Sequence, residues 1–314
     1  MTGGFRAAHP AVAMLYFAGM LLFAALLLHP VFLLTALLGL TALVLAQGLG
    51  PNLLRSLPFL GLTGVSVAVL NPLFSHRGSH LLFYSFDQPI TLEAVLYGLL
   101  MMMVLWLVMV LFISYNATVT PDKFLYLFGG IAPQATLLLL MALRFVPLFQ
   151  RRLRRITLIQ RTRGIDVRHG SLRKRLRDGM TLLKVLLSLS LEEALDTADS
   201  MKARGYGVRK RSVYGIYKLD RLDRVALLLL AGCGITVAIC QMSGFGAYEL
   251  YPRMKPAVWG RGETLMYVCY CLFLLLPLAL EGRERWIWRS SRRNNYPSGI
   301  RRQNVSRSTG SPSK

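Results

Sequence analysis

Two short motifs combine a small residue, an arginine and a glycine, and each follows a stretch with helical periodicity. The first motif is Thr162-Arg163-Gly164 and the second is Ala203-Arg204-Gly205. A guanidinium makes planar, paired hydrogen bonds with carbonyl or carboxylate oxygens. A small neighbour and a tight glycine turn let the surface of another protein come close to that guanidinium. The pattern therefore favours two rigid docking ends.

Helix capping explains part of the same pattern. A glycine just after a helix is a common left-handed cap, and an arginine in the last turn suits the negative end of the helix dipole. One such ending would be ordinary. Two endings on consecutive helices, each with a small residue before the arginine, favour docking, although capping alone stays open as the alternative.

Pairs of carboxylates give no comparable signal. Asp196 and Asp199 share one side of a helix, but Lys202 follows on the next turn, so pairing of surface charges explains them better than catalysis. The remaining close pairs, Asp220 with Asp223 and Glu192 with Glu193, belong to no recognisable metal or phosphotransfer pattern. The sequence therefore predicts no catalytic residue.

Histidine and cysteine give no strong metal site either. His76 and His80 have the spacing of two ligands on a helix, but Gly78 between them favours an exposed loop. The cysteines all lie in apolar runs, where a free thiol behaves as a small buried apolar side chain; they are Cys233, Cys240, Cys269 and Cys271. We expect neither a bound metal nor a cofactor.

The elements that must position the two motifs belong to a membrane protein. The 314 residues are 54% hydrophobic and 17% charged, whereas soluble domains carry roughly a quarter charged residues. Six uncharged stretches are long enough, or nearly so, to cross a bilayer core of about 30 Å. Lipid cannot satisfy backbone polar groups, so each is predicted to be an α-helix. The stretches are Ala11–Leu28, Val31–Leu49, Leu57–Phe74, Ala94–Tyr115, Val225–Ser243 and Thr264–Leu280.

The predicted fold is therefore all-α, a polytopic membrane protein with about six transmembrane helices and a basic helical insert. The insert carries 22 of the 37 basic residues. The predicted domains are a four-span membrane domain over 1–115, the insert over 116–224, a membrane hairpin over 225–280 and a basic, disordered tail over 281–314.

Charge sets the orientation. The net charge is +22, and cytoplasmic segments of membrane proteins are enriched in lysine and arginine. With the N-terminus inside, only Arg77, Arg253, Lys255 and Arg261 lie outside, which leaves 33 of the 37 basic residues in the cytoplasm. Both termini and the insert are predicted to be cytoplasmic.

Two long helices are predicted within the insert. The first begins at Pro133, and its uncharged part, Ala135–Leu143, is too short to span a bilayer. The second begins after Ser171, a plausible N-cap, and is apolar at helical spacing from Leu182 to Met201. This apolar face suits a membrane partner, and it suits packing of the two helices on each other equally well.

The paired motifs in this setting resemble the transmembrane T component of energy-coupling factor (ECF) transporters, a family that includes the cobalt-type CbiQ proteins. The family hallmark is Ala-Arg-Gly, which is intact at Ala203–Gly205, whereas Thr162 replaces the first alanine. The resemblance covers roughly residues 9–280. Further similar segments are His29-Pro30, Asn71-Pro72-Leu73-Phe74 with Arg77-Gly78, Thr120-Pro121-Asp122 and Leu143-Arg144-Phe145-Val146-Pro147.

The resemblance implies a non-catalytic coupling subunit of an ATP-driven importer in the bacterial inner membrane. Thr162, Arg163 and Gly164 would dock on one ABC-type ATPase, and Ala203, Arg204 and Gly205 on a second. A substrate-binding membrane S component would lie beside the chain, with Leu182, Leu186 and Leu189 as its predicted contacts. The imported substrate would be a vitamin or a transition-metal ion.

Two rival classes fit the sequence less well. An integral-membrane enzyme would need clustered catalytic side chains, and a secondary transporter usually has an ionisable residue within a span, which the six stretches lack. The chain also has no G-x-x-x-x-G-K-[S/T] phosphate loop, so a partner must supply the energy of ATP hydrolysis. Binding of nucleic acid by residues 151–177 is not expected, because an anionic leaflet attracts the same basic residues.

Overall fold

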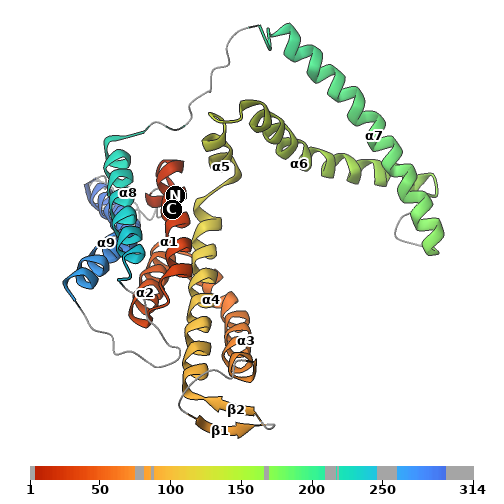
Figure 1. The fold of residues 1–314 in the computed structure, drawn as a ribbon. Coiled ribbons are helices and arrows are strands. Elements are labelled where there is room, and N and C mark those ends of the chain that lie inside the picture. The colour runs from red at the N-terminus through yellow and green to blue at the C-terminus, as the bar shows by residue number, and fades with distance from the viewer. Residues whose placement is uncertain are drawn as a thin grey trace, which may run out of the picture. The chain divides into compact units, whose positions relative to one another are not determined.

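The computed structural model describes residues 4–74, 81–85, 88–165, 170–208, 217, 219–245 and 260–294, and of 81–90 and 284–294 it describes the backbone alone. The described residues form helices almost throughout, as the all-α prediction requires (Figure 1). They divide into two compact units, 1–120 with 217–314 (unit 1) and 121–216 (unit 2). His76, His80 and residues 295–314 of the predicted tail lie outside the described residues, whereas residues 281–294, which were predicted to belong to the disordered tail, continue as helix.

The described part of unit 1 contains six long helices and one short helical turn. The two N-terminal helices start alike: His9 and His29 are N-caps whose Nδ1 accepts a hydrogen bond from the backbone N–H two residues on, and a proline follows each. The elements are η1 (Gly4–Arg6), α1 (Pro10–Leu26), α2 (Pro30–Ala46), α3 (Gly50–Phe74), α4 (Leu92–Thr118), α8 (Arg221–Met242) and α9 (Arg261–Asn294).

A small antiparallel hairpin joins α3 to α4, and no periodicity in the sequence predicted it. Strand β1 (Leu81–Ser85) pairs with β2 (Gln88–Thr91), with Ser85 opposite Gln88. Thr91 ends the hairpin and also caps α4, because its side chain accepts a hydrogen bond from the N–H of Ala94. Apart from this hairpin, the described part of unit 1 is helical.

The helices that could cross a membrane differ in part from the predicted six. By length and composition, five described helices qualify: α3, α4, α8, α9 up to Arg283, and α6 (Pro133–Thr162). Helices α1 and α2 are apolar but have 17 residues each, which at about 1.5 Å per residue is slightly less than a bilayer core. Helix α6 was predicted to be too short because Arg144 interrupts its apolar run; the run resumes with Phe145 and Val146, and a single arginine does not disqualify it.

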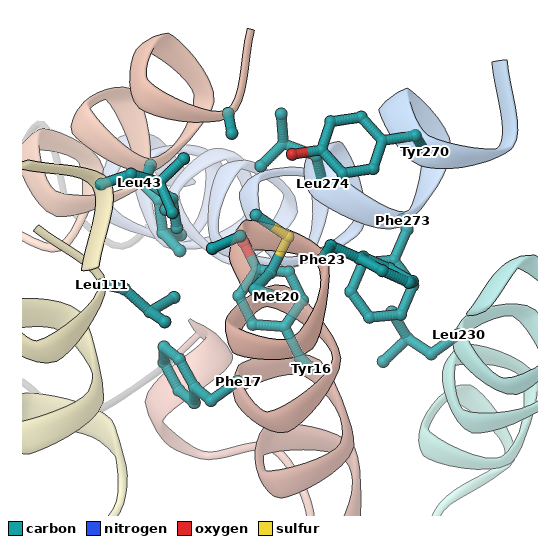
Figure 2. Packing of buried hydrophobic residues seen from close by; sticks show 14 of the residues in the cluster. Tyr16, Phe17, Met20, Phe23, Leu43, Leu111, Leu230, Tyr270, Phe273 and Leu274 are labelled. Carbon is teal, nitrogen blue, oxygen red and sulfur yellow. The ribbon is translucent and has the colours of Figure 1, made fainter. Parts of the chain in front are cut away.

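The core of unit 1 surrounds α1 (Figure 2). Tyr16 of α1 stacks on Phe273 of α9, with ring centroids 5.6 Å apart, and Phe23 meets Phe273 edge to face. Leu111 of α4 and Leu230 of α8 complete the same cluster. Helices from both halves of the chain thus share one apolar core.

Polar contacts fix the two points at which the chain leaves and re-enters unit 1. At the end of α4, the Thr118 hydroxyl accepts a hydrogen bond from Gln47 Nε2 at 3.3 Å. At the start of α8, Asp223 accepts one from the backbone N–H of His9 at 3.4 Å. The carboxylate of Glu281 in α9 accepts a third from the N–H of Phe5 at 2.9 Å. Unit 2 is therefore inserted between two anchored helix ends.

Glycine permits close contact between α3 and α4. A Cβ added at Gly98 of α4 would lie 3.0 Å from the carbonyl oxygen of Ala68 in α3, and backbone cannot move aside as a side chain can. We expect Gly98→Val to lower the free energy of unfolding by about 1–3 kcal/mol, the usual cost of overpacking, and to lower the Tm of the purified protein in detergent. Gly61→Val is the matched control, because a Cβ at Gly61 of α3 meets nothing within 4 Å; equal losses of Tm would contradict the assignment.

Unit 2 consists of α5 (Pro121–Phe128), α6 (Pro133–Thr162) and α7 (Leu172–Ala203). Helix α7 packs on α6, where Ile156 and Leu182 are buried and Arg152 forms an ion pair with Glu193. Most other apolar side chains of α6 and α7 are exposed. The sequence thus folds unit 2 into two long helices whose apolar surface is only partly used within the chain.

Candidate docking ends and apolar face of unit 2

The end of α6 is a complete glycine cap. Gly164 has φ +79°, in the left-handed region that favours glycine. Its N–H donates to the carbonyl of Arg161 at 3.0 Å, and the N–H of Ile165 donates to that of Gln160 at 3.1 Å. These two bonds define a Schellman motif, in which Arg163 is the C-cap residue.

The end of α7 repeats this geometry. Gly205 also has φ +79°. Its N–H donates to the carbonyl of Lys202 at 2.9 Å, and the N–H of Tyr206 donates to that of Met201 at 3.0 Å. Arg204 is the C-cap residue, as Arg163 is in α6. The two motifs predicted from sequence are thus equivalent in backbone geometry as well as in residue type.

Two helices of unit 1 show that the cap requires the glycine of the motif but not the arginine. Helices α2 and α8 end in the same pair of bonds, with Gly48 at φ +74° and Gly244 at φ +86°. Their C-cap residues are Gln47 and Ser243. A Schellman cap therefore needs the glycine but not an arginine before it. Capping alone accounts for Gly164 and Gly205 and leaves the choice of arginine unexplained beyond a modest dipole effect.

Both arginines are available to a partner. Thr162, Arg163, Gly164, Ala203, Arg204 and Gly205 are all exposed. Among the described residues, neither the Arg163 nor the Arg204 side chain has a hydrogen-bond or ion-pair partner. The Thr162 hydroxyl donates to the carbonyl of Ile159 at 2.6 Å, so its polar group is satisfied within its own helix. Thr162 can therefore replace alanine at the docking surface without requiring a new hydrogen-bond partner.

The two candidate docking ends belong to different helices and are far apart along α7. Residues 163–171 connect the end of α6 to the start of α7. Helix α7 has 32 residues, which at about 1.5 Å per residue gives a rod about 48 Å long. Arg204 is the C-cap of α7 and so lies at the opposite end of this rod from Ser171. The geometry suits contact with two bodies, or with two distant places on one body.

The predicted contacts of a membrane partner lie on the face of α7 that turns toward α6. Leu182 is 4% exposed and Leu186 is half-buried, whereas Leu189 is 41% exposed. Of the three, Leu189 is the most accessible to another protein. Leu182 instead belongs to the contact between the two long helices.

The structure exposes a different apolar stripe on α7 that the sequence reasoning did not single out. Its members recur every three or four residues and are all more than half exposed; they are Leu172, Leu176, Met180, Leu183, Leu187, Leu191 and Leu195. At 3.6 residues per turn, they follow one side of the helix, away from Leu182. The spacing of the stripe is visible in the sequence, but α7 has two apolar faces, and periodicity alone does not say which one α6 covers.

The described residues contain no group of three or more His, Cys, Asp or Glu side chains arranged to hold a metal ion. The four cysteines are free thiols and half-buried. Elsewhere in unit 2, at the start of α5, burial lowers the pKa of the Lys123 amine. The chief features of unit 2 are its exposed arginines and its exposed apolar surface, and both are suited to binding other proteins.

Comparison with known proteins places this geometry in a family. Residues 5–214 match the family described as cobalt transport protein, CbiQ. This match includes both candidate docking ends and the whole of α6 and α7. The chain belongs to the CbiQ family.

Relatives of the CbiQ-family chain include transporter components. An energy-coupling factor transporter transmembrane protein EcfT from Leuconostoc gelidum is 35% identical over 100 residues, which is 32% of this chain and 37% of that protein. The EcfT protein of Staphylococcus aureus is 29% identical over 112 residues, 35% of this chain and 42% of that protein. An uncharacterized protein MG181 homolog from Mycoplasma pneumoniae is 32% identical over 104 residues, 33% of this chain and 24% of that protein. The matched segments thus span less than half of each relative.

Proposed function

We propose that this chain is the transmembrane coupling subunit of an ECF-type importer. The observation that carries the proposal is the pair of equivalent ends, each with an exposed arginine at the C-cap of a long helix. Each arginine docks on one of two cytoplasmic ABC-type ATPases. ATP-driven closure of the ATPase pair moves α6 and α7, and this motion reorients a substrate-binding S component in the membrane.

The proposal includes the orientation and the cargo class. The chain lies in the bacterial plasma membrane with both termini and unit 2 on the cytoplasmic side, since that orientation keeps most of the +22 net charge inside. The imported substrate is a vitamin or a transition-metal ion, held by the S component. The chain itself performs no catalysis and needs no cofactor.

Co-purification tests the composition of the complex. The tagged chain, expressed in its natural host and extracted in mild detergent, is expected to bring down two ABC-type ATPase subunits and a small membrane protein. The complex should hydrolyse ATP. Recovery of the chain without any ATPase would contradict the proposed function.

The apolar stripe on α7 is the proposed contact of the S component. An exposed leucine contributes little to the stability of its own chain, but it contributes to binding when a partner covers it. We expect Leu183→Ala with Leu187→Ala to reduce the affinity for the S component by about thirtyfold, at roughly 1 kcal/mol per leucine, and so to lower its recovery on co-purification, with little change in Tm. Leu182→Ala is the comparison, because its buried side chain should cost stability instead. If the Leu183 and Leu187 double variant recovers as much S component as the parent chain, the contact with the S component lies elsewhere.

A further inference from the structure

Charge is distributed unevenly along α7. Its first part, residues 172–184, contains one acid, Asp178, and five cations; they are Arg173, Lys174, Arg175, Arg177 and Lys184. All five cations are exposed, whereas Asp178 is buried. Residues 185–201 contain four acids and no cation. The exposed charge on the first part of α7 is therefore entirely positive, and that on the next turns is negative.

The cations and the exposed apolar side chains of the first part occupy different sides of the helix. Leu172, Leu176 and Met180 are more than half exposed, and at about 100° per residue they share an arc of about 80°. The five cations occupy a separate arc of about 200°, which runs from Arg173 round to Arg175. A helix that lies on a membrane has this arrangement, with apolar residues on one side and cations on the other.

Three of the cations border the apolar arc on one side. Arg173, Lys184 and Arg177 follow its edge at Met180 by about 20°, 40° and 60° of rotation. Long basic side chains at such an edge can lay their apolar stems along the arc and extend their charged ends to lipid phosphates. Asp178 lies about 160° from Leu176, on the opposite side of the helix, so it does not interrupt this border.

The chain alone does not account for these cations. The first turn of α7 contains no acid, and its N-cap, Ser171, makes no side-chain capping bond. Cations at a helix N-terminus are unfavourable, because the partial charge there is already positive. An anionic partner offsets this cost, and an apolar partner covers the leucines. A lipid leaflet supplies both, since phosphates cover its acyl chains.

We propose that the first part of α7 lies in the headgroup region of an anionic leaflet. Leu172, Leu176 and Met180 enter the boundary with the acyl chains, while the bordering cations bind lipid phosphates. Unit 2 already contains a membrane-type helix, because α6, on which α7 packs, is long and apolar enough to cross a bilayer. The inference takes from the proposed function only the cytoplasmic position of unit 2.

The same arc continues toward the proposed contact with the S component. Leu183 and Leu187 fall within it at about 100° per residue, so both parts of the stripe face the membrane. Beyond them, the exposed acids Glu192, Asp196 and Asp199 replace the cations, and an anionic leaflet repels them. Lipid therefore covers the first part of the stripe and leaves the rest to a protein partner.

A fluorescent label on the stripe tests this placement in the full-length chain. The four native cysteines are replaced by alanine, and Leu176→Cys carries an environment-sensitive nitrobenzoxadiazole group. Leu195→Cys, on the same stripe beside the acids, is the matched control. Each chain is placed in phosphatidylcholine nanodiscs with or without phosphatidylglycerol, and nitroxide groups on the acyl chains near the headgroups quench a label that enters the leaflet.

The label at position 176 is expected to be quenched with phosphatidylglycerol present. Each cation near an anionic surface contributes roughly fivefold to binding, so without that lipid the ratio of inserted to exposed label should fall at least about tenfold. High salt should have the same effect, because it screens the attraction. The label at position 195 should stay unquenched in both lipids.

Charge variants identify the cations responsible. Arg173→Gln, Arg177→Gln and Lys184→Gln together should lower the inserted fraction as much as removal of phosphatidylglycerol does. Arg151→Gln, Arg154→Gln and Arg155→Gln remove the same charge from exposed positions of α6 and should change the ratio less than twofold. Arg173→Lys with Arg177→Lys should retain quenching, since lipid attraction needs the charge and not the planar guanidinium. Retained quenching also shows that substitution here leaves the fold intact.

Three results would overturn the inference. The first is a label at position 176 that stays in water in both lipids. The second is quenching that ignores phosphatidylglycerol, or that the α6 variant reduces as much as the α7 variant does. The third is a label that responds only when the co-purifying ATPases are added, which would assign the cations to a protein surface. Absence of any co-purifying ATPase would instead contradict the proposed function and leave a lipid-dependent signal unaffected.

Discussion

Alanine at both Arg163 and Arg204 is expected to abolish ATP-driven uptake, by at least about 100-fold, while the protein stays in the membrane. Each guanidinium would make charge-assisted hydrogen bonds to an ATPase, and each such bond contributes about 1.5–3 kcal/mol. Loss of two such bonds corresponds to about 3–6 kcal/mol, or a factor of about 100 or more. Both side chains are exposed and lack described partners, so the fold should tolerate the change. Uptake of substrate into cells that express the complete transporter measures the effect.

Matched substitutions on the same helices separate docking from general loss of charge. Arg155→Ala with Lys184→Ala removes one exposed cation from α6 and one from α7, away from both caps, and uptake should change less than twofold. Arg163→Lys with Arg204→Lys keeps the charge but loses the planar fork, so uptake should recover only in part. A double alanine variant that still drives uptake with its ATPases would reject the docking ends.

The sequence predicted the membrane helices and the glycine-capped ends of α6 and α7 well, because both depend on local patterns. Uncharged apolar runs can only be helices in lipid, and each of the six predicted runs coincides with a helix of unit 1, although three of them extend one to three residues past the helix end. A glycine after a helical stretch predicts a left-handed backbone conformation that caps the helix. The structure accordingly ends α6 at Thr162 and α7 at Ala203, with glycine two residues later in each case.

Features that depend on long-range packing were less predictable. Helix α7 is apolar on two sides, and only the position of α6 decides that Leu182 is buried and Leu183 exposed. The bonds from Gln47 to Thr118 and from His9 to Asp223 join residues far apart in sequence.

Alanine at both Gly164 and Gly205 is expected to reduce uptake at least about tenfold, a larger effect than its loss of stability of about 2–4 kcal/mol explains. An L-residue in the left-handed region costs about 1–2 kcal/mol. A Cβ at either position meets nothing within 4 Å in the chain itself. Any larger effect on uptake must therefore come from a partner that approaches these turns closely. Uptake and Tm, measured on the same preparations, separate the two contributions.

Gly48 and Gly244 provide controls with nearly the same backbone. They end α2 and α8 in the same cap, with φ +74° and +86°, and a Cβ at either also meets open space. Alanine at both should lower Tm about as much as the Gly164 and Gly205 pair, with uptake retained. Equal losses of uptake from the two pairs would show that the glycines matter only as helix caps.

Asparagine at the docking glycines distinguishes backbone conformation from close approach. Asparagine tolerates the left-handed region better than alanine does, so Gly164→Asn with Gly205→Asn should restore much of the lost Tm. If glycine is needed only to cap the helices, uptake should recover with it. If an ATPase surface lies against the turns, the larger side chain should keep uptake low although the cap is repaired. We expect the second result, because Arg163 and Arg204 can make paired hydrogen bonds only when the partner surface comes close to both turns.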